Sequence, residues 1–310
     1  MIVDFPASPL HPISSLELDR AGVRLFLKRD DLIDPHLGGN KWRKLKYNLV
    51  QAHEQQEATL LTFGGAYSNH IYAVAAAGKR FGLRTIGVIR GEPSSAANAT
   101  LSFARSCGMH LYFVDRAAYR RKHEAEFIAQ LRDRFGPHFL LTEGGSNTLA
   151  LPGCAEIVAE LDAQLPSGYD VLATPVGSGG TLAGLASGLV GRTTQALGFA
   201  VLKGGQGLVD DVSQLLASAG SAAGQWRIDQ NYHFNGYARC NETLFAFIKN
   251  FRASTGVQLD PIYNGKMLYG LFDQIRLGAF ARGTTLVALH TGGLQGWAGI
   301  SEKYGLTLGQ

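Results

Sequence analysis

Cysteine is scarce in this chain of 310 residues, and its placement excludes two ways of stabilising a fold. The cysteines are odd in number, lie far apart and form no Cys-x-x-Cys pair: Cys107, Cys154 and Cys240. A disulfide framework needs paired cysteines, and a structural zinc site needs closely spaced ones. The sequence predicts neither, so stability must come from a core, for which a 45% hydrophobic composition is sufficient.

Long apolar runs and strong net charge are also missing. No stretch approaches the roughly 18 apolar residues of a membrane-spanning helix, and the N-terminus lacks a basic segment followed by an apolar one. The formal net charge is only +4, with scattered basic residues, so no nucleic-acid-binding surface is indicated. We therefore expect a cytoplasmic enzyme that acts on a small molecule, without nucleic-acid or membrane partners.

Glycine, in contrast, is abundant: its 39 residues are nearly twice the average usage of about 7%. Strand-like and helix-like segments alternate along the chain, and glycines cluster where the strand-like runs end. The predicted elements include strands at 59–63, 84–90 and 171–176 and helices at 69–81, 117–134 and 181–190. This alternation is typical of an α/β fold with parallel sheets covered by helices on both faces, and two series of strands predict two sheets.

A lysine directly follows the Gly-Gly-Asn turn at 38–40 and opens the helix-like segment 41–56. Glycines adopt backbone conformations closed to other residues, so the turn can present the Lys41 amine at the head of the helix. The positive helix terminus disfavours an ammonium group there, and so do three cationic neighbours: Arg43, Lys44 and Lys46. We expect Lys41 to be partly deprotonated and nucleophilic near neutral pH. The alternative is a solvated basic face.

Glycine-rich turns end four strand-like runs, at 64–65, 144–145, 177–181 and 291–293. In one of them, backbone N–H groups, two hydroxyls and a helix N-terminus can converge on a phosphate dianion. This turn consists of Gly177, Ser178, Gly179, Gly180 and Thr181. A dinucleotide site is the competing interpretation, but the next strand ends near Lys203 without an acidic residue for the ribose. A tight turn with a serine or threonine cap is the plain alternative.

These features together indicate a cofactor. A lysine able to condense with an aldehyde, a glycine cup for one phosphate and no cluster of metal ligands point to pyridoxal phosphate. Lys41 would hold this cofactor covalently.

At this point seven motifs match a known family in their order along the chain. They are Gly38-Gly39-Asn40-Lys41, Ser68-Asn69-His70, Gly144-Gly145-Ser146-Asn147, Gly177 to Thr181, Gly236-Tyr237, Asp260 to Lys266 and His290-Thr291-Gly292-Gly293. The chain resembles the D-cysteine desulfhydrase and 1-aminocyclopropane-1-carboxylate deaminase family. The resemblance implies fold type II of pyridoxal-phosphate enzymes, similar to tryptophan synthase β, and a homodimer. It also implies two domains with largely parallel sheets: a large cofactor-binding domain of residues 1–44 plus 149–310, and a small inserted domain of residues 45–148.

The resemblance also assigns roles near Lys41, which would hold the cofactor and, once released, move protons. Ser68 would lie beside the substrate α-carbon as proton donor or nucleophile; without the resemblance it is better explained as the N-cap of helix 69–81. Asn69 would bind the phenolic oxygen of the cofactor and contact the substrate. His70 would lie near the substrate carboxylate, whereas a histidine in a first helical turn is ordinarily a polar surface residue.

Three further residues receive roles from the same motifs. Tyr237 and Tyr263 would bring hydroxyl groups and a ring face to cofactor and substrate, and either could be the acid at a leaving group. The alternative is two core aromatics, although their glycine- and proline-marked loops favour function. Thr291 would meet the pyridine nitrogen with a neutral hydroxyl, which should favour elimination over transamination.

The substrate is where the sequence departs from the family pattern. Ring-opening deaminases typically carry Glu where this chain has Asn264, and Gln where it has His70; the desulfhydrases carry Thr or Ser and His. The resemblance therefore favours a lyase that converts D-cysteine to pyruvate, ammonia and sulfide. The alternatives are 1-aminocyclopropane-1-carboxylate deamination and a lyase for a related small D-amino acid. Two readings from other functional classes are a non-catalytic binding or regulatory protein that keeps the fold and the cofactor, and a nucleotide-binding α/β protein.

Overall fold

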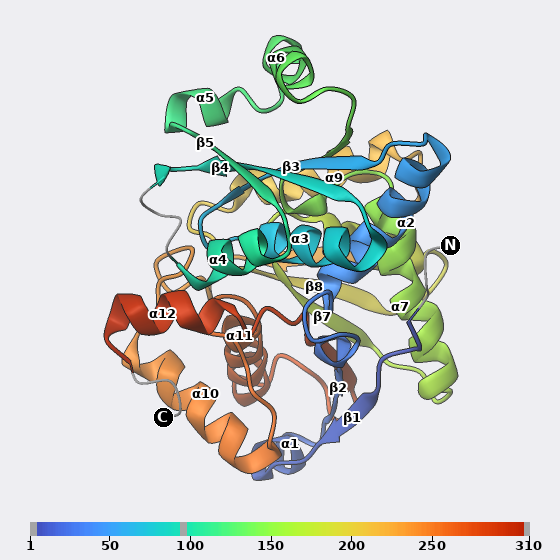
Figure 1. Ribbon diagram of the computed structural model, residues 1–310. Coiled ribbons are helices and arrows are strands. Elements are labelled where there is room, and N and C mark those ends of the chain that lie inside the picture. Colours follow the sequence, from blue (N-terminus) through green and yellow to red (C-terminus); the bar gives the residue numbers. More distant parts are fainter. Residues whose placement is uncertain (1–4, 94–97, 307–310) are drawn as a thin grey trace.

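Two sheets organise the chain in a computed structural model that describes residues 5–93 and 98–306 (Figure 1). The larger sheet has six strands in the order β1-β2-β10-β7-β8-β9. Their bounds are Leu10–Ile13, Arg24–Lys28, Thr285–Leu289, Val171–Val176, Gln195–Ala200 and Trp226–Asp229. Only the edge pair β1–β2 is antiparallel; the other neighbours pair in parallel. Both ends of the chain therefore contribute strands to one sheet.

The smaller sheet has four strands in the order β5-β4-β3-β6, all parallel. Their bounds are His110–Val114, Arg84–Arg90, Thr59–Gly65 and Phe139–Leu141. Helices α3 (Asn69–Phe81) and α4 (Ala99–Ser106) lie below this sheet in Figure 1, and α5 (Arg116–Arg120) and α6 (Ala125–Phe135) lie above it. Each face has its own apolar cluster, so this sheet is covered on both sides.

The larger sheet is likewise buried on both faces, and β7 shows why. Its alternate residues Val171 and Ala173 belong to the cluster that contains α10 and α11, whereas Leu172 and Val176 belong to the cluster that contains α7, α8 and α9. The helices around this sheet are α1 (Leu16–Ala21), α7 (Ala150–Gln164), α8 (Gly180–Gly188), α9 (Gln206–Ser218), α10 (Glu242–Thr255), α11 (Asn264–Arg276) and α12 (Gly296–Tyr304). Helix α2 (Asn40–Glu54) packs its apolar residues against the smaller sheet and also contacts α7. Short 3₁₀ turns lie at Asp30–Leu32 and Glu143–Gly145. None of the described helices is both long and apolar enough to span a membrane.

The predicted α/β class with two parallel-dominated sheets is confirmed. The predicted helix 69–81 and the strands 84–90 and 171–176 have the bounds that the sequence indicates. The single helix predicted over 117–134 is wrong, because the chain turns between α5 and α6. At that turn Arg121 pairs with Glu124 at 2.9 Å and Lys122 with Glu143 at 3.4 Å. These ion pairs stabilise the interruption between the two helices, where residues 121–124 include no glycine or proline that would predict it.

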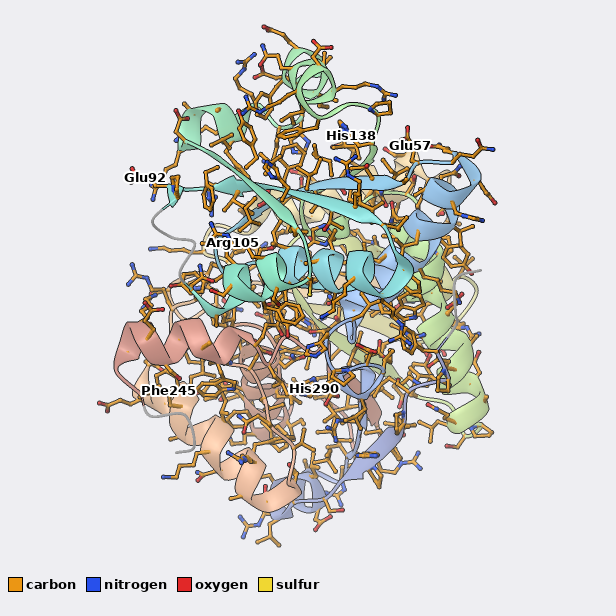
Figure 2. The ribbon with its side chains drawn as sticks, viewed as in Figure 1. Glu57, Glu92, Arg105, His138, Phe245 and His290 are labelled. Carbon is orange, nitrogen blue, oxygen red and sulfur yellow. The ribbon has the colours of Figure 1, made fainter. Side chains whose placement is uncertain are left out.

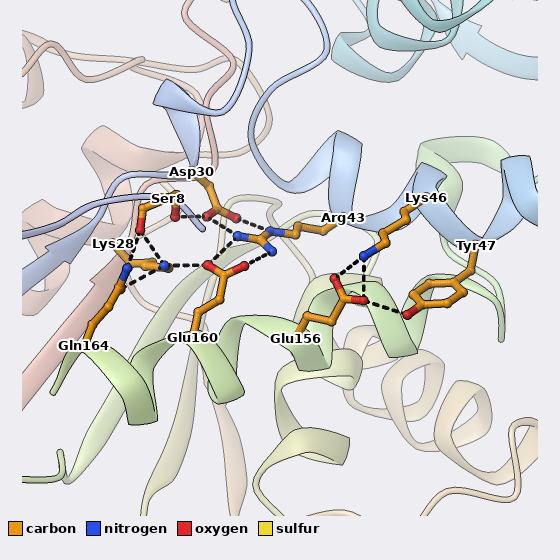
Figure 3. Close-up of polar contacts among 9 residues, drawn as sticks. All are labelled: Ser8, Lys28, Asp30, Arg43, Lys46, Tyr47, Glu156, Glu160 and Gln164. Carbon is orange, nitrogen blue, oxygen red and sulfur yellow. Dashed lines mark hydrogen bonds and ion pairs between the residues drawn. The ribbon is translucent and has the colours of Figure 1, made fainter. Parts of the chain in front are cut away.

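A buried cluster of charges anchors α2 against α7 (Figure 3). Arg43 lies between two carboxylates, with Nη2 3.0 Å from Asp30 Oδ1 and Nη1 2.5 Å from Glu160 Oε1. Lys28 approaches the same Glu160 at 2.6 Å and is itself fully buried. Burial alone would lower the pKa of Arg43, but Asp30 and Glu160 outweigh it and raise that pKa. The start of α2 is thus fixed by ion pairs within the protein.

Candidate active site

The turn before Lys41 needs glycine for steric reasons. Gly39 has a φ of 69°, and a Cβ there would lie 2.1 Å from the carbonyl oxygen of Thr291. A Cβ on Gly38 would lie 2.3 Å from the carbonyl oxygen of Asp34. Any other residue at either position would push α2 away from its neighbours. The close approach of Gly39 to Thr291 therefore brings Lys41 next to the loop after β10.

A cavity of about 260 Å³ opens beside this turn. Of the site residues expected from the sequence, it is lined by Lys41, Asn69, Tyr263 and Thr291, which come from four separate segments of the chain. The cavity walls do not include the other expected residues: Ser68, His70, Tyr237, Asn264 and the 177–181 turn. Its remaining lining comes from residues 31–40, from Tyr72 and Ala73 on α3, and from residues 292–295.

Lys41 is half-buried, and its amine is poised near neutrality. Burial and, second to it, the charge of Lys44 lower its pKa from 10.5 to about 7. The predicted direction agrees, but the predicted cause was incomplete. Arg43 is neutralised by Asp30 and Glu160, and Lys46 lies 2.8 Å from Glu156, so neither acts on the Lys41 amine. The alternative of a solvated basic face is wrong, because Arg43 and Lys44 are only 4% and 2% exposed.

We expect Lys41 in the cofactor-free protein to react with a simple aldehyde at a rate that follows its neutral fraction. The midpoint should lie near pH 7, because the ammonium form predominates only below that pKa. A surface lysine would react with a midpoint above about pH 10. The rate of adduct formation, followed by mass spectrometry after borohydride reduction at several pH values, measures it. A midpoint above pH 9 would contradict the assigned environment.

Asn40 connects Lys41 to the predicted phosphate turn. Its Oδ1 accepts from Lys41 Nζ at 2.9 Å, and its Nδ2 donates to Thr181 Oγ1 at 2.9 Å. Thr181 lies in the first turn of α8, whose N-cap is Gly179 with a φ of 78°. The Asn40 side chain therefore links the Lys41 amine to the glycine turn at 177–181, although that turn does not line the cavity.

A second lysine lies over the glycine turn. Lys44 Nζ donates to the carbonyl oxygen of Gly144 at 2.7 Å, to Ser146 Oγ at 2.9 Å and to Ser178 Oγ at 3.3 Å. A Cβ at Gly180 would lie 2.5 Å from Ser146 Oγ, so only glycine lets these two turns approach. Burial lowers the pKa of Lys44 to about 8, so it is still largely protonated at neutral pH. A cation without an acidic partner among the described residues, two hydroxyls and a helix N-terminus fit an anion such as phosphate.

Ser68 and Asn69 begin α3. Ser68 Oγ accepts from the Ile71 backbone N–H at 3.3 Å, which makes it the N-cap, as the plain reading of the sequence predicts. This contact leaves the hydroxyl hydrogen free, so a catalytic role for Ser68 stays a prediction. Asn69 faces the loop after β10, where a Cβ on Gly293 would lie 2.6 Å from its Nδ2. Asn69 therefore connects α3, which packs on the smaller sheet, with the loop that follows β10 of the larger sheet.

His70 is buried beneath the 144–145 turn, so the surface interpretation is wrong. Its Nε2 lies 2.8 Å from Thr62 Oγ1, whose own hydrogen goes to the Leu141 carbonyl at 3.0 Å. His70 must therefore donate through Nε2, since burial and the charges of Lys41 and Lys44 hold its pKa well below 6.5 and keep it neutral. Its Nδ1 is buried and makes no hydrogen bond of good geometry among the described residues, although the Thr142 backbone is near enough to raise the pKa slightly. With the proton on Nε2, Nδ1 can accept a hydrogen bond but cannot donate one to a substrate carboxylate. The expected contact of His70 with the substrate carboxylate stays a prediction.

The two expected tyrosines touch each other. Tyr263 Oη lies 3.4 Å from Tyr237 Oη, and the rings pack edge to face with centroids 6.0 Å apart. Tyr263 also lies over the glycine turn, because a Cβ on Gly177 would be 3.2 Å from its ring. Burial raises the pKa of both phenols, so both keep their protons at neutral pH. Tyr263 lines the cavity and Tyr237 does not, so the hydrogen bond between them connects the cavity to Tyr237.

Thr291 follows β10 and His290, which Figure 2 labels near the middle of the molecule. Asn264 Oδ1 accepts from the Thr291 backbone N–H at 2.9 Å and from its hydroxyl at 3.2 Å. Asn264 Nδ2 donates to Asp260 Oδ2 at 2.6 Å and to the Gly292 carbonyl at 2.8 Å. Both ends of this buried amide are occupied within the protein. Asn264 thus supports Thr291, and its expected contact with substrate stays a prediction.

Sequence reasoning missed Asn40 and Ser146 as site residues and treated Lys44 only as a neighbouring charge. Lys44 lies three residues after Lys41, so both project from one side of a helix, and this spacing was the available signal. For Ser146, the signal was a serine directly after the Gly144-Gly145 pair. Neither signal says that the two turns meet, because that contact depends on the packing of α2 against α7 and α8.

The model of the pyridoxal-phosphate-dependent enzyme family matches residues 5–292 of this chain. The chain belongs to this family. It is therefore a pyridoxal-phosphate-dependent enzyme, and the cofactor expected from the Lys41 turn and the glycine cup is confirmed for the family.

Relatives of this pyridoxal-phosphate-dependent enzyme carry two kinds of name. A putative 1-aminocyclopropane-1-carboxylate deaminase of Pyrococcus furiosus is 30% identical, over 91% of this chain and 88% of its own. A D-cysteine desulfhydrase of Klebsiella pneumoniae is 29% identical, over 92% of this chain and 91% of its own. Among solved structures, a 1-aminocyclopropane-1-carboxylate deaminase homologue superposes with a TM-score of 0.84 at 28% identity, covering 97% of this chain and 94% of that one. The resemblance to the D-cysteine desulfhydrase and 1-aminocyclopropane-1-carboxylate deaminase family is confirmed, as is fold type II.

Proposed function

We propose that this enzyme is a lyase that removes sulfide from D-cysteine. Water and D-cysteine would yield pyruvate, ammonia and hydrogen sulfide. The observation that carries the proposal is one cavity lined by an amine with a pKa of about 7 and by a phenol that stays protonated. Elimination needs both groups: a base for the α-proton and an acid for the leaving sulfur.

The residues of the chain divide this work. Bound pyridoxal phosphate would supply the electron sink that makes the α-proton of the substrate acidic. Lys41, which would hold the cofactor, then takes up the α-proton through Nζ, and its pKa of about 7 suits a base at neutral pH. Tyr263, whose hydroxyl donates to that of Tyr237 at 3.4 Å, would turn this hydrogen to the departing sulfur. Asn69 and Thr291 line the same cavity and would contact the cofactor ring.

We propose that the phosphate lies in the cup formed by the 177–181 turn, Ser146 and Lys44. Replacing Lys44 by Met should then weaken cofactor binding by about 10- to 150-fold, since a hydrogen bond to a charged group contributes about 1.5–3 kcal/mol. Titration of the cofactor-free variant, followed by absorbance, measures this. Lys46→Met is the matched control, because Lys46 is on the same helix but pairs with Glu156. Equal affinities for the two variants would contradict the location of the cup.

The substrate is tested with purified enzyme and a panel of D-amino acids. Sulfide and pyruvate released in equal amounts from D-cysteine, and little from L-cysteine, are the expected result. D-Serine and other small D-amino acids with a leaving group on Cβ test whether a related D-amino acid is preferred. No turnover of any of them would remove the substrate assignment while leaving the family intact.

Deamination of 1-aminocyclopropane-1-carboxylate is the second candidate, favoured by the names of several relatives. Its substrate has no α-hydrogen, so a group near Cβ must open the ring. Asn264 is neutral and its amide is occupied by Asp260, Thr291 and Gly292, which weighs against it as that group. Formation of 2-oxobutanoate faster than pyruvate from D-cysteine would reverse our ranking.

We also propose that the enzyme is a cytoplasmic homodimer with the two domains that the resemblance implies. The smaller sheet, made of strands between residues 59 and 141, lies within the proposed small domain of residues 45–148. The proposed boundary at residue 44 falls inside α2. Sedimentation equilibrium of the purified protein tests the dimer, and a monomer at micromolar concentration would contradict it.

A further inference from the structure

Lys266 on α11 is a fully buried lysine that no carboxylate pairs with in the part of the chain that the structure describes. Its ammonium instead donates to backbone carbonyls. Nζ lies 2.7 Å from the oxygen of Gly236, 3.0 Å from that of His233 and 3.4 Å from that of Val201. Carbonyl oxygens that converge on one small cation resemble the coordination of a dehydrated monovalent ion.

This arrangement is costly for a group that only fills the core. Burying an ammonium without a counter-charge is unfavourable, and an apolar side chain of similar volume would pack there at lower cost. The cost shows in the pKa of Lys266, which burial lowers to about 8. We therefore look for the role of the Lys266 ammonium in the backbone carbonyls that it binds.

Two of the three carbonyls belong to an irregular segment between β9 and α10, residues 232–240, in which the backbone is strained. Phe234, Asn235 and Ala238 have φ values of 51°, 65° and 51°, in the left-handed region that side chains disfavour. Such conformations persist only where the surroundings over-determine them. Lys266 binds the carbonyls of His233 and Gly236, which enclose Phe234 and Asn235, and so holds the strained turn closed.

Tyr237 follows Gly236 directly, and its hydroxyl lies 3.4 Å from that of Tyr263 on the cavity wall. We propose that Lys266 is a positioning residue, whose ammonium gathers the carbonyls of residues 201, 233 and 236 and thereby sets Tyr237 against Tyr263. The link to catalysis rests on the proposed function; the link to the 232–240 segment does not.

The test replaces the ammonium and then returns a cation. In Lys266→Ala, trypsin should cut after the exposed Arg239 much faster than in the parent, because the segment is released. The value of kcat/KM for D-cysteine should fall by about 10²-fold, mainly through kcat, since a displacement of about 1 Å in a catalytic group has effects of that size. Potassium chloride should reverse both changes by at least about tenfold, because potassium fits a ring of carbonyls. Tetramethylammonium chloride at equal concentration should not, because the ion is too large.

Lys303→Ala is the matched control. Its Nζ donates to the Ala238 carbonyl of the same segment at 2.7 Å, but Lys303 is exposed, so water can replace it. It should resemble the parent in proteolysis and in kcat/KM, with no dependence on potassium. Lys266→Met keeps the apolar stem and serves where the alanine variant does not fold.

The outcomes are separable. Unchanged proteolysis in Lys266→Ala, or a faster cleavage that potassium does not slow, overturns the proposal, as does failure of both variants to fold in potassium chloride. A parent enzyme that does not turn over D-cysteine overturns the proposed function alone, because the cleavage rate after Arg239 still reports on Lys266. Faster cleavage that potassium reverses, with kcat unchanged, supports the hold on the segment and overturns the positioning of Tyr237.

Discussion

Replacing Lys41 by Ala is expected to reduce turnover of the substrate by at least about 10³-fold, since a positioned acid or base alone contributes about 10²- to 10⁴-fold. Lys41 would lose two roles at once, because the same amine would hold the cofactor and carry the α-proton. The variant should also lose the absorbance band near the visible edge that a lysine-bound cofactor gives. Steady-state kinetics and borohydride fixation followed by mass spectrometry measure the two effects.

The control for Lys41 is Lys249→Ala, on the exposed side of α10. It should keep both activity and covalently fixed cofactor. A Lys41→Ala protein that still bears cofactor after borohydride treatment would show that another lysine carries it. Lys44 would then be the first to examine, because its pKa of about 8 also leaves part of it neutral at neutral pH.

Replacing Arg43 by Ala is expected to cause the largest loss of stability, about 3–5 kcal/mol in the free energy of unfolding. The variant leaves the fully buried Asp30 without its ion-pair partner. Glu160 also loses Arg43 and keeps only its ion pair with Lys28 among the described residues. The bridge from Arg43 on α2 to Glu160 on α7 is lost with it, while the pair Lys46–Glu156 still joins the two helices (Figure 3). Urea unfolding of the cofactor-free protein measures the change, so that cofactor binding does not mask it.

Arg192→Ala offers a comparison, because the partner of Arg192, Asp162, also lies on α7. Arg192 forms a bidentate ion pair with Asp162, with Nη1–Oδ1 and Nη2–Oδ2 distances of 2.5 and 2.7 Å. Both side chains of this pair are 40% exposed. A pair in water contributes about 0–1 kcal/mol. Similar losses for the two variants would mean that burial does not amplify the Arg43 cluster.

The sequence predicts elements well where local signals agree. Helix α3 is an example, because Ser68 caps its start and Gly82, with a φ of 69°, ends it. It predicts poorly where distant contacts decide. Helix α12 is not among the elements expected from the sequence; in the fold, its Gly299 makes room for Tyr67, whose ring a Cβ there would approach to 2.5 Å.

The same division holds within the site. Lys41 and the 177–181 turn can be found from the sequence, because glycine turns and a lysine after them are local features. The bond from Asn40 to Thr181 and the contacts of Lys44 with Ser146 and Ser178 cannot, since they join residues more than 100 positions apart. The position of Asn264 shows the converse limit: a motif can mark a residue for the substrate, while packing commits its amide to Thr291 and Asp260.

The strand order of the larger sheet has a consequence for biosynthesis. Strand β10 (Thr285–Leu289) lies between β2 and β7, so the sheet has a gap in its middle until β10, the last of its strands in the described chain, has been made. The four-stranded sheet is encoded without interruption between residues 59 and 141 and can form during translation. Thr291 follows β10 directly, and so the nascent chain can complete the cavity beside Lys41 only after the strands of the four-stranded sheet have been made.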